Sequence, residues 1–297
     1  MKRTEKIAGL FFLCGLFACG TTGAKSPRTN PAHQAQAGRP RRIPLRIYRN
    51  FLVVAEGQFG GALEHQNFVL DTGTAPSIVN ARSARDLGLT TRPSTMTAMG
   101  KIILTNTAIL GEVELGPIHA VSLRVQVQEL SRLERDLGIP IAGILGLDVL
   151  SKSSFRLDYD KKEMEFGDVT DQGIPVSFDE RTGTAVALVS LDGMPARLLV
   201  DTGSDRVAVL GGNLADAERL ALRNTPQKGS SLADPTMAVQ VFFTRGIVFG
   251  GKHFALEKAY FIPGGADPSF DGILGVRALG FRAIAYDQAR AAIYLQK

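Results

Sequence analysis

The sequence predicts a mainly β protein built from two similar lobes. Three observations support this fold class. Short apolar runs separated by glycine-marked turns dominate the chain after residue 42. The tripeptide Asp-Thr-Gly occurs twice, as Asp71-Thr72-Gly73 (the first motif) and Asp201-Thr202-Gly203 (the second motif), and each copy follows an apolar run. Both copies also lie within a longer pattern that is repeated along the chain.

Four landmarks of this pattern recur in one order at nearly constant spacing. Ile-Pro precedes the first motif by 28 residues and the second by 27. Gly-Ile-Leu-Gly follows at 143–146 and 272–275, and Tyr-Asp follows at 159–160 and 286–287. Such a repeat indicates a duplicated unit rather than two chance tripeptides. We therefore expect a first lobe over residues 43–167 and a second over 168–297.

The chain begins with a predicted export signal. Three basic residues precede the apolar stretch Ile7–Ala18, which is short for a membrane-spanning helix. Its end, Leu16-Phe17-Ala18-Cys19-Gly20, resembles the lipobox of bacterial lipoproteins, in which the cysteine is acylated and becomes the mature N-terminus. Residues 1–18 are thus predicted to be a signal peptide and Cys19 a lipidation site. An ordinary secretory signal with an incidental cysteine is the alternative.

Residues 19–42 are predicted to form the lipidated cysteine and a flexible basic tether, because they lack apolar periodicity. We expect a protein that is lipid-anchored in a bacterial cell envelope, faces the periplasm or exterior, and lies on the outer membrane in preference to the inner. Residues 1–42 hold eight Lys and Arg against one acid, whereas the rest holds 26 basic and 28 acidic residues. The positive net charge is therefore no argument for nucleic-acid binding.

Each unit contains β-rich segments, at 43–56 and 174–191, before the strand that leads into its motif. A short helix follows each motif, predicted at 81–87 before Gly88 and at 214–220. Glycine turns punctuate the next strands, at Gly116-Pro117 and Gly250-Gly251.

These motifs resemble those of the retropepsin/pepsin-like aspartic proteases in their bilobal, single-chain form. The shared signatures are apolar-apolar-Asp-Thr-Gly-Thr/Ser and the later apolar-apolar-Gly, and they cover about residues 43–297. The resemblance implies two β-barrel-like lobes related by pseudo-two-fold symmetry, with an active-site cleft between them. It also implies that Asp71 and Asp201 are the catalytic residues.

The resemblance further assigns supporting roles to the residues that complete each motif. The threonines would hydrogen-bond across the lobes, the glycines would let backbone approach the carboxylates, and the next hydroxyls would bond the outer carboxylate oxygens. These residues are Thr72, Gly73, Thr74, Thr202, Gly203 and Ser204.

Two adjacent carboxyl groups do not both ionise easily, so they share one proton. The carboxylate takes a proton from water as that water attacks the peptide carbonyl, and the acid stabilises the developing oxyanion. This mechanism requires no covalent intermediate, cofactor or metal. It also suits a body without cysteine, since Cys14 and Cys19 are the only two in the chain.

The sequence departs from pepsin-like enzymes at the flap. Those enzymes carry a flap tyrosine, usually backed by a tryptophan, but this chain has no Trp, and its five tyrosines lie outside the candidate flap segments 91–104 and 224–240. Each segment is either a glycine-hinged lid or a surface loop. The shorter units favour the retropepsin-like side of the family.

Other residue patterns indicate no further chemistry. The four histidines are scattered, without an acidic cluster at ligand spacing, so no zinc site is predicted. Asp148 and Arg277 occupy matching positions after the two Gly-Ile-Leu-Gly segments. We interpret them as solvated surface charges, with a structural ion pair as the alternative, and the run Val241–Phe243 as core.

The leading hypothesis is an aspartic endopeptidase that acts as a monomer on peptide or protein substrates. The alternative is a catalytically silent, peptide-binding lipoprotein that retains the fold. A homodimer is disfavoured, because one chain already carries both halves of the site.

Overall fold

The computed structural model describes residues 41–60, 63–99, 101–167, 169, 172–179, 182–211, 237–263, 267 and 269–297, and the backbone of the strands at 10–12, 16–17 and 227–231. The predicted lipidation site Cys19, the tether up to residue 40 and the helix predicted at 214–220 lie outside these residues. Most described residues are in strands, which confirms the predicted mainly β fold. Among them, no helix has the length and apolarity needed to cross a membrane.

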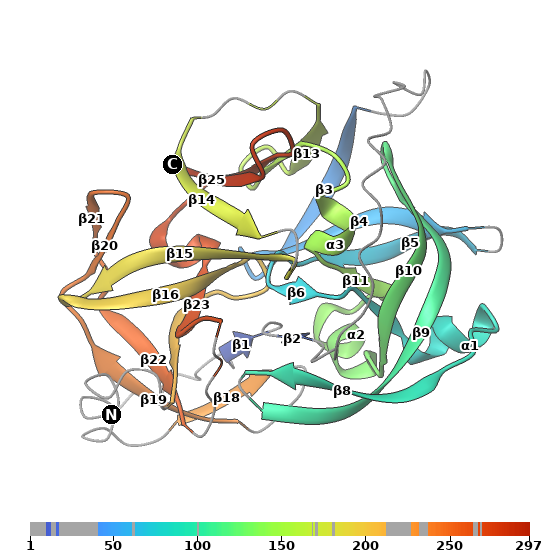
Figure 1. Ribbon diagram of the computed structural model, residues 1–297, viewed down its shortest axis with the longest axis horizontal. Helices are drawn as coiled ribbons and strands as arrows, with labels where there is room; N and C mark the ends of the chain where they lie inside the picture. The colour runs from blue at the N-terminus through green and yellow to red at the C-terminus, as the bar shows by residue number, and fades with distance from the viewer. Residues whose placement is uncertain are drawn as a thin grey trace, which may run out of the picture.

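The first lobe is a closed ring of strands, on the right of Figure 1. Its order is β4–β5–β11–β7–β10–β9, and β9 pairs back to β4. The ring strands are β4 (Leu52–Phe59), β5 (Leu63–Leu70), β7 (Ile78–Asn80), β9 (Lys101–Leu115), β10 (Ile118–Gln128) and β11 (Gly143–Leu145). Because β9 returns to β4, each described strand of the ring pairs with a neighbour on both sides.

Short elements connect and extend this ring. They are β6 (Thr74–Ala75), α1 (Ala81–Asp86), β8 (Arg92–Ala98), α2 (Ser131–Leu137) and α3 (Leu147–Leu150). The predicted helix at 81–87 is confirmed as α1. Asn80 caps it by accepting a hydrogen bond from the Arg82 N–H, and Gly88 follows its end with φ +64°.

The second lobe repeats the same order, on the left of Figure 1. Its elements are β15 (Thr184–Leu191), β16 (Met194–Asp201), β17 (Val207–Leu210), β19 (Ala238–Phe243), β20 (Ile247–Phe249), β21 (Lys252–Phe254), β22 (Lys258–Ile262), β23 (Gly272–Gly275) and the 3₁₀ helix η1 (Val276–Leu279). The ring runs β15–β16–β23–β17–β22–β19, and β20 pairs back to β15. The counterpart of the continuous β9 is thus split at residues 244–246, where Gly246 has φ +144°.

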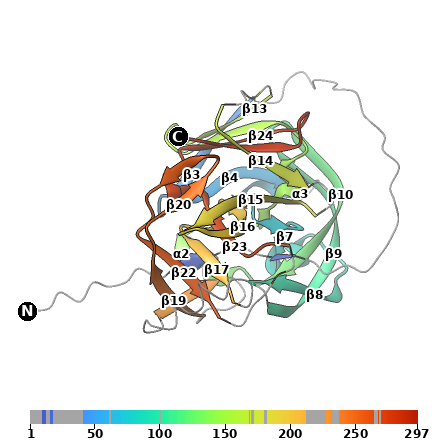
Figure 2. The same ribbon diagram turned by 60° about the vertical axis from the view of Figure 1, so that its left-hand side comes forward.

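One six-stranded sheet joins the lobes, in the order β3–β13–β12–β24–β25–β14. Its strands are β3 (Arg42–Tyr48), β12 (Phe155–Asp158), β13 (Glu163–Phe166), β14 (Ile174–Asp179), β24 (Ala283–Asp287) and β25 (Ala292–Gln296), at the top of Figure 2. Ile43 pairs with Met164 as Ile174 pairs with Leu295. At the centre Leu157 faces its own counterpart, Ile284, so the pseudo-two-fold axis passes through this pair.

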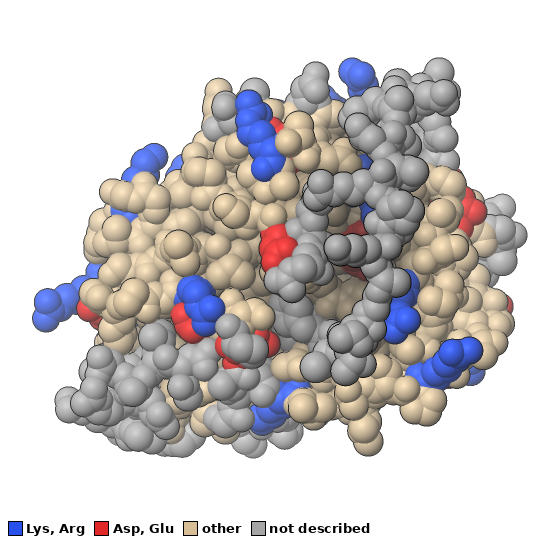
Figure 3. All heavy atoms as spheres, in the orientation of Figure 1, with Lys and Arg blue, Asp and Glu red and all other residues tan. Residues whose placement is uncertain are grey.

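The apolar core follows the strands, with one exception to the prediction. Val241 and Phe242 are buried, but Phe243 is 62% exposed, so its assignment to the core was wrong. Phe243 is the last residue of β19 before the break at 244–246, and the Lys258 ammonium lies 5.8 Å from its ring centroid. On the face drawn in Figure 3, charged side chains of both signs are scattered among neutral ones.

Candidate active site

Each motif sits where a buried strand ends beside its Gly-Ile-Leu-Gly segment. β5 runs parallel to β11 with Val69 opposite Ile144, and β16 runs parallel to β23 with Leu199 opposite Ile273. The second glycine of each segment packs against the loop that follows the motif. A Cβ at Gly146 would lie 2.0 Å from the Thr74 carbonyl oxygen, and one at Gly275 would lie 2.6 Å from that of Ser204. Only glycine permits this approach.

The two motif threonines hold the loops together across the lobes. The Thr72 N–H donates to Thr202 Oγ1 at 3.0 Å, and the Thr202 N–H donates to Thr72 Oγ1 at 3.2 Å. Each hydroxyl in turn donates to a carbonyl oxygen of the other lobe, that of Val200 for Thr72 and that of Leu70 for Thr202, both at 2.9 Å. All four bonds are buried, and their symmetry fixes the two aspartates relative to each other.

Asp71 and Asp201 are both fully buried, and the Asp201 carboxyl lies close enough to act on the pKa of Asp71. Asp71 also accepts bonds from its own loop, to Oδ1 from the Gly73 N–H at 2.8 Å and to Oδ2 from the Thr74 hydroxyl at 2.8 Å. The Gly203 N–H donates to Asp201 Oδ1 at 2.6 Å. Burial raises the pKa of the Asp71 carboxyl, because desolvation outweighs the hydrogen bonds that favour its charged form.

The hydroxyls after the two motifs behave differently. Thr74 bonds Asp71, as the family resemblance implies. The Ser204 hydroxyl instead donates to the Arg206 carbonyl oxygen at 3.3 Å and accepts from the Arg206 N–H at 3.2 Å. Ser204 therefore closes its own backbone turn.

Asp148 stabilises the loop that follows the first motif through hydrogen bonds from Ser77. It accepts from the Ser77 N–H at 2.9 Å and from the Ser77 hydroxyl at 2.6 Å, and Ser77 Oγ accepts from the Gly146 N–H at 2.9 Å. Burial raises the pKa of Asp148, and the bonds from Ser77 oppose the rise. The interpretation of Asp148 as a solvated charge was therefore wrong.

Arg277 occupies the matching position in the second lobe but reaches into the first. Its Nε donates to the Asn50 carbonyl oxygen at 3.1 Å, and its Nη1 donates to that of Phe281 at 2.7 Å. Its guanidinium carbon lies 5.1 Å from the ring centroid of Tyr159. Neither a solvated charge nor an ion pair with Asp148 describes it. The sequence signal for both residues was that a charged side chain stands at the same position after each Gly-Ile-Leu-Gly segment.

The candidate flap segment 91–104 contains a β-hairpin formed by β8 and β9. Met99 at its turn is 2% exposed and packs in an apolar cluster with Leu199 and Phe270 of the second lobe. Ile102 and Leu104, on the outer face, are 75% and 88% exposed. This hairpin, which we call the flap hairpin, thus spans from one lobe to the other. In the other candidate segment, 224–240, β18 (Gln227–Ser231) pairs with β19.

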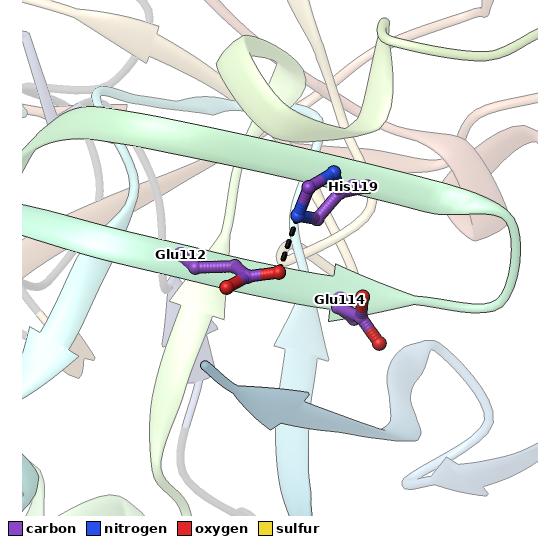
Figure 4. A group of neighbouring side chains, drawn as sticks. All are labelled: Glu112, Glu114 and His119. Carbon is purple, nitrogen blue, oxygen red and sulfur yellow. Dashed lines mark hydrogen bonds and ion pairs between the residues drawn. The ribbon is translucent and has the colours of Figure 1, made fainter. Parts of the chain in front are cut away.

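A second polar group lies away from the aspartates, on one face of the β9–β10 hairpin. Glu112, Glu114 and His119 offer three ligand atoms within 4.8 Å of one another, and His119 pairs with Glu112 (Figure 4). The sequence did not indicate this group, because the turn between β9 and β10 is what brings His119 beside Glu112 and Glu114. The group is partly exposed, and its matching position in the second lobe holds Gly246 and His253 without acids, so the two lobes do not share it.

The structure brings together all eight residues expected at the motifs: Asp71, Thr72, Gly73, Thr74, Asp201, Thr202, Gly203 and Ser204. Two buried, neighbouring carboxyls with a raised pKa on one of them form an arrangement suited to combined acid and base catalysis. Ser77 and Met99 are contributors that the sequence did not reveal, whereas Asp148 and Arg277 were noted in it but misinterpreted.

Comparison with known proteins agrees with this geometry for the first lobe. No curated protein matches the chain. Residues 55–149, from within β4 to within α3, match the family model described as aspartyl protease. This match supports an aspartic protease family for the part of the chain that carries the first motif.

Proposed function

We propose that the protein is an aspartic endopeptidase that hydrolyses peptide bonds with a water activated by Asp71 and Asp201. The observation that carries the proposal is the symmetric placement of these carboxyls, in contact with each other at the ends of two equivalent strands. The aspartyl protease match supports protease activity in general.

The proposed chemistry uses the two carboxyls in turn. The ionised group accepts a proton from water as that water attacks the substrate carbonyl, and the protonated group donates a hydrogen bond to the developing oxyanion. Proton transfer to the leaving amine then completes hydrolysis without a covalent intermediate. The raised pKa of Asp71 supports this division, because it keeps a proton on the pair to higher pH than an ordinary carboxyl would.

We further propose that the protein works as a monomer, anchored by a lipid on Cys19 in a bacterial cell envelope and facing the periplasm or exterior. The lipobox-like sequence at its N-terminus supports this location. Mass spectrometry of the N-terminal peptide isolated from membranes tests it, because acylation adds a defined mass to Cys19. An unmodified cysteine, or an N-terminus elsewhere, would contradict the anchor.

The decisive experiment compares aspartate variants isolated from the envelope of producing cells. Incubation with a diverse peptide mixture from pH 3 to 7 should give cleavage with a bell-shaped pH profile. Asp71→Asn and Asp201→Asn should each lower the rate by about 10³-fold or more with unchanged circular dichroism. The matched control is Asp86→Asn, which removes an exposed carboxylate of α1.

Full activity in either dyad variant would refute the two-carboxylate mechanism. Tight peptide binding without cleavage by the wild type would instead support a silent peptide-binding protein.

A further inference from the structure

The polar group on the β9–β10 hairpin consists of side-chain types that bind metal ions in proteins. Glu112 and Glu114 lie on β9, and His119 lies directly opposite Glu114 on β10. One ligand atom of each side chain lies within 4.8 Å of the other two. Figure 4 shows the carboxylates on one strand and the imidazole on the other, with His119 Nε2 directed at Glu112. We call these three residues the His–Glu group.

Strand geometry holds the His–Glu group on one face of the hairpin. Residues two apart on a strand point to the same side, so Glu112 and Glu114 share a face. A residue directly opposite on the neighbouring strand points the same way, which adds His119 to that face. The alternate residues Val113 and Leu115 point inward and are 0% exposed. The paired backbone therefore presents the three side chains together.

The neighbouring strand β4 leaves room for the Glu112 carboxylate. The Gly60 N–H, just after β4, donates to the Glu112 carbonyl oxygen at 3.1 Å. A Cβ at Gly60 would lie 2.6 Å from Glu112 Oε2, which is too close for a side chain. The carboxylate thus lies against the Gly60 backbone on one side and contacts His119 on the other.

A cavity opens beside the His–Glu group. It has a volume of about 250 Å³, and Glu114 forms part of its wall. The other polar side chains of that wall are Glu56, Gln58 and His65. Gln58 lies directly opposite Glu114 across the β4–β9 pairing. The cavity therefore offers further oxygen and nitrogen donors next to Glu114 and space for the water ligands of an ion.

The charges of the His–Glu group favour a cation. His119 pairs with Glu112, but a protonated imidazole carries one positive charge and the group carries two carboxylates. Two carboxylates on one strand face repel each other, and a cation between them removes that repulsion. A divalent ion neutralises both carboxylates and bonds the imidazole in its neutral form.

We propose that the His–Glu group binds one divalent transition-metal ion, and that Zn²⁺ fits it best. Zinc takes imidazole nitrogen and carboxylate oxygen as ligands, and a four-coordinate ion keeps one further position for water. Its ligands lie about 2.0–2.2 Å from the ion and so about 3.4 Å from one another, a spacing that the group reaches by side-chain rotation. Calcium and magnesium prefer oxygen ligands alone, so the imidazole disfavours them.

The site lies where the first-lobe ring closes, which gives the ion a structural role. β9 returns to β4 through two residue pairs, Gln58 with Glu114 and Phe59 with Val113. An ion bound by both β9 and β10 would hold these strands in register beside that short pairing. Because it binds the folded chain alone, it would raise stability by mass action. His119 and Glu112 are each 37% exposed, so the ion can enter from solution.

The test uses the full chain isolated from producing cells, with Zn²⁺ as the probe. Protein stripped of metal by a chelator is titrated with Zn²⁺ by calorimetry at neutral pH, and its Tm is measured with and without the ion. His119→Ala and Glu114→Gln each remove one ligand. The matched controls, His253→Ala and Glu257→Gln, remove exposed side chains of the same types from the second lobe. Circular dichroism checks that each variant folds, and either ligand variant alone is a sufficient test.

We expect one zinc ion per chain and a higher Tm in its presence. Each ligand variant should bind zinc about 100-fold more weakly or worse, since a direct ligand contributes at least as much as the groups that orient ligands. The controls should match the wild type, and Ca²⁺ and Mg²⁺ should leave its Tm unchanged.

Equal zinc affinity in the wild type and a folded ligand variant would overturn the proposal. So would a wild-type Tm that does not respond to zinc, which would leave His119 and Glu112 as an ion pair only. Calcium binding that survives His119→Ala but not Glu114→Gln would refute coordination by the imidazole. None of these measurements requires peptide cleavage, so their outcome is independent of the proposed function.

Discussion

The two lobes share a ring of strands and a motif but stabilise their catalytic loops differently. In the first lobe Thr74 bonds Asp71, and Asp148 with Ser77 braces the loop entirely within that lobe. In the second lobe Ser204 bonds its own backbone turn, and Arg277 crosses to the first lobe. One loop is therefore held from within and the other from across the interface, so substitutions at matching positions should have unequal effects except at the shared threonines.

The largest effect on stability is expected at those threonines. Thr72→Val and Thr202→Val each remove a hydroxyl that donates one interlobe bond and accepts another, leaving buried backbone groups unpaired. Each should lower the free energy of unfolding by about 2–5 kcal/mol, and to a similar extent. Urea denaturation measures both, with the exposed Thr95→Val as control. A large loss of unfolding free energy in one variant and none in the other would show that the two threonines do not contribute equally.

A smaller and unequal effect is expected at the matching charged positions. Asp148→Ala leaves the buried Ser77 N–H and hydroxyl without their acceptor, which should destabilise the protein by about 1–3 kcal/mol. Arg277→Ala removes partly exposed bonds and should cost about 1 kcal/mol. Thermal or urea unfolding gives both values. A greater loss of unfolding free energy in Arg277→Ala would show that the interlobe contact of Arg277 contributes more than the bonds of Asp148 within the first lobe.

The pH dependence of cleavage should distinguish the hydroxyls after the motifs. The Thr74 hydroxyl lowers the pKa of Asp71 by bonding its charged form, so Thr74→Val should raise that pKa further. Because the two carboxyls titrate as a coupled pair, the pH profile of cleavage should then move to higher pH. Ser204→Ala should shift it less, because Ser204 bonds the Arg206 backbone. Rate profiles from pH 3 to 8 test this, and equal shifts would remove the distinction.

The smallest expected effect is on the pH dependence of stability. The folded pKa of Asp148 lies above its ordinary value of 3.8, so the folded state binds this proton more tightly than the unfolded chain. Its contribution to stability is present below pH 3.8 and is lost as pH rises through the raised pKa. Asp148→Asn cannot ionise and should flatten the decline in unfolding free energy over that range. An unchanged slope would mean that other carboxyls, such as Asp71 and Asp205, govern it.

The duplicated landmarks made much of this architecture predictable. Ile43 and Ile174 occupy equivalent positions in the shared sheet, and both motifs follow strands paired to Gly-Ile-Leu-Gly segments. A repeat carries this information because equal spacing in sequence becomes equal position in two copies of one fold.

The remaining features depend on contacts that local patterns do not encode. The sequence suggests a surface charge at Asp148, because its partner Ser77 lies 71 residues away in the chain. One of the two carbonyl partners of Arg277 belongs to the other lobe. Phe243 follows the alternation of a core strand, yet it lies at the point where that strand ends. The pairing of the strands at 10–12 and 16–17 with β18, β6 and β8 joins segments far apart in the chain, so periodicity gave no sign of it.

The shared sheet has a consequence for how the protein unfolds. β12 and β24 are its two central strands, and they come from different lobes. Loss of one lobe would leave the other with a bare central strand edge, which is both unstable and prone to pair with further chains. The lobes are therefore separate in sequence, but each depends on the other to cover an edge of the shared sheet.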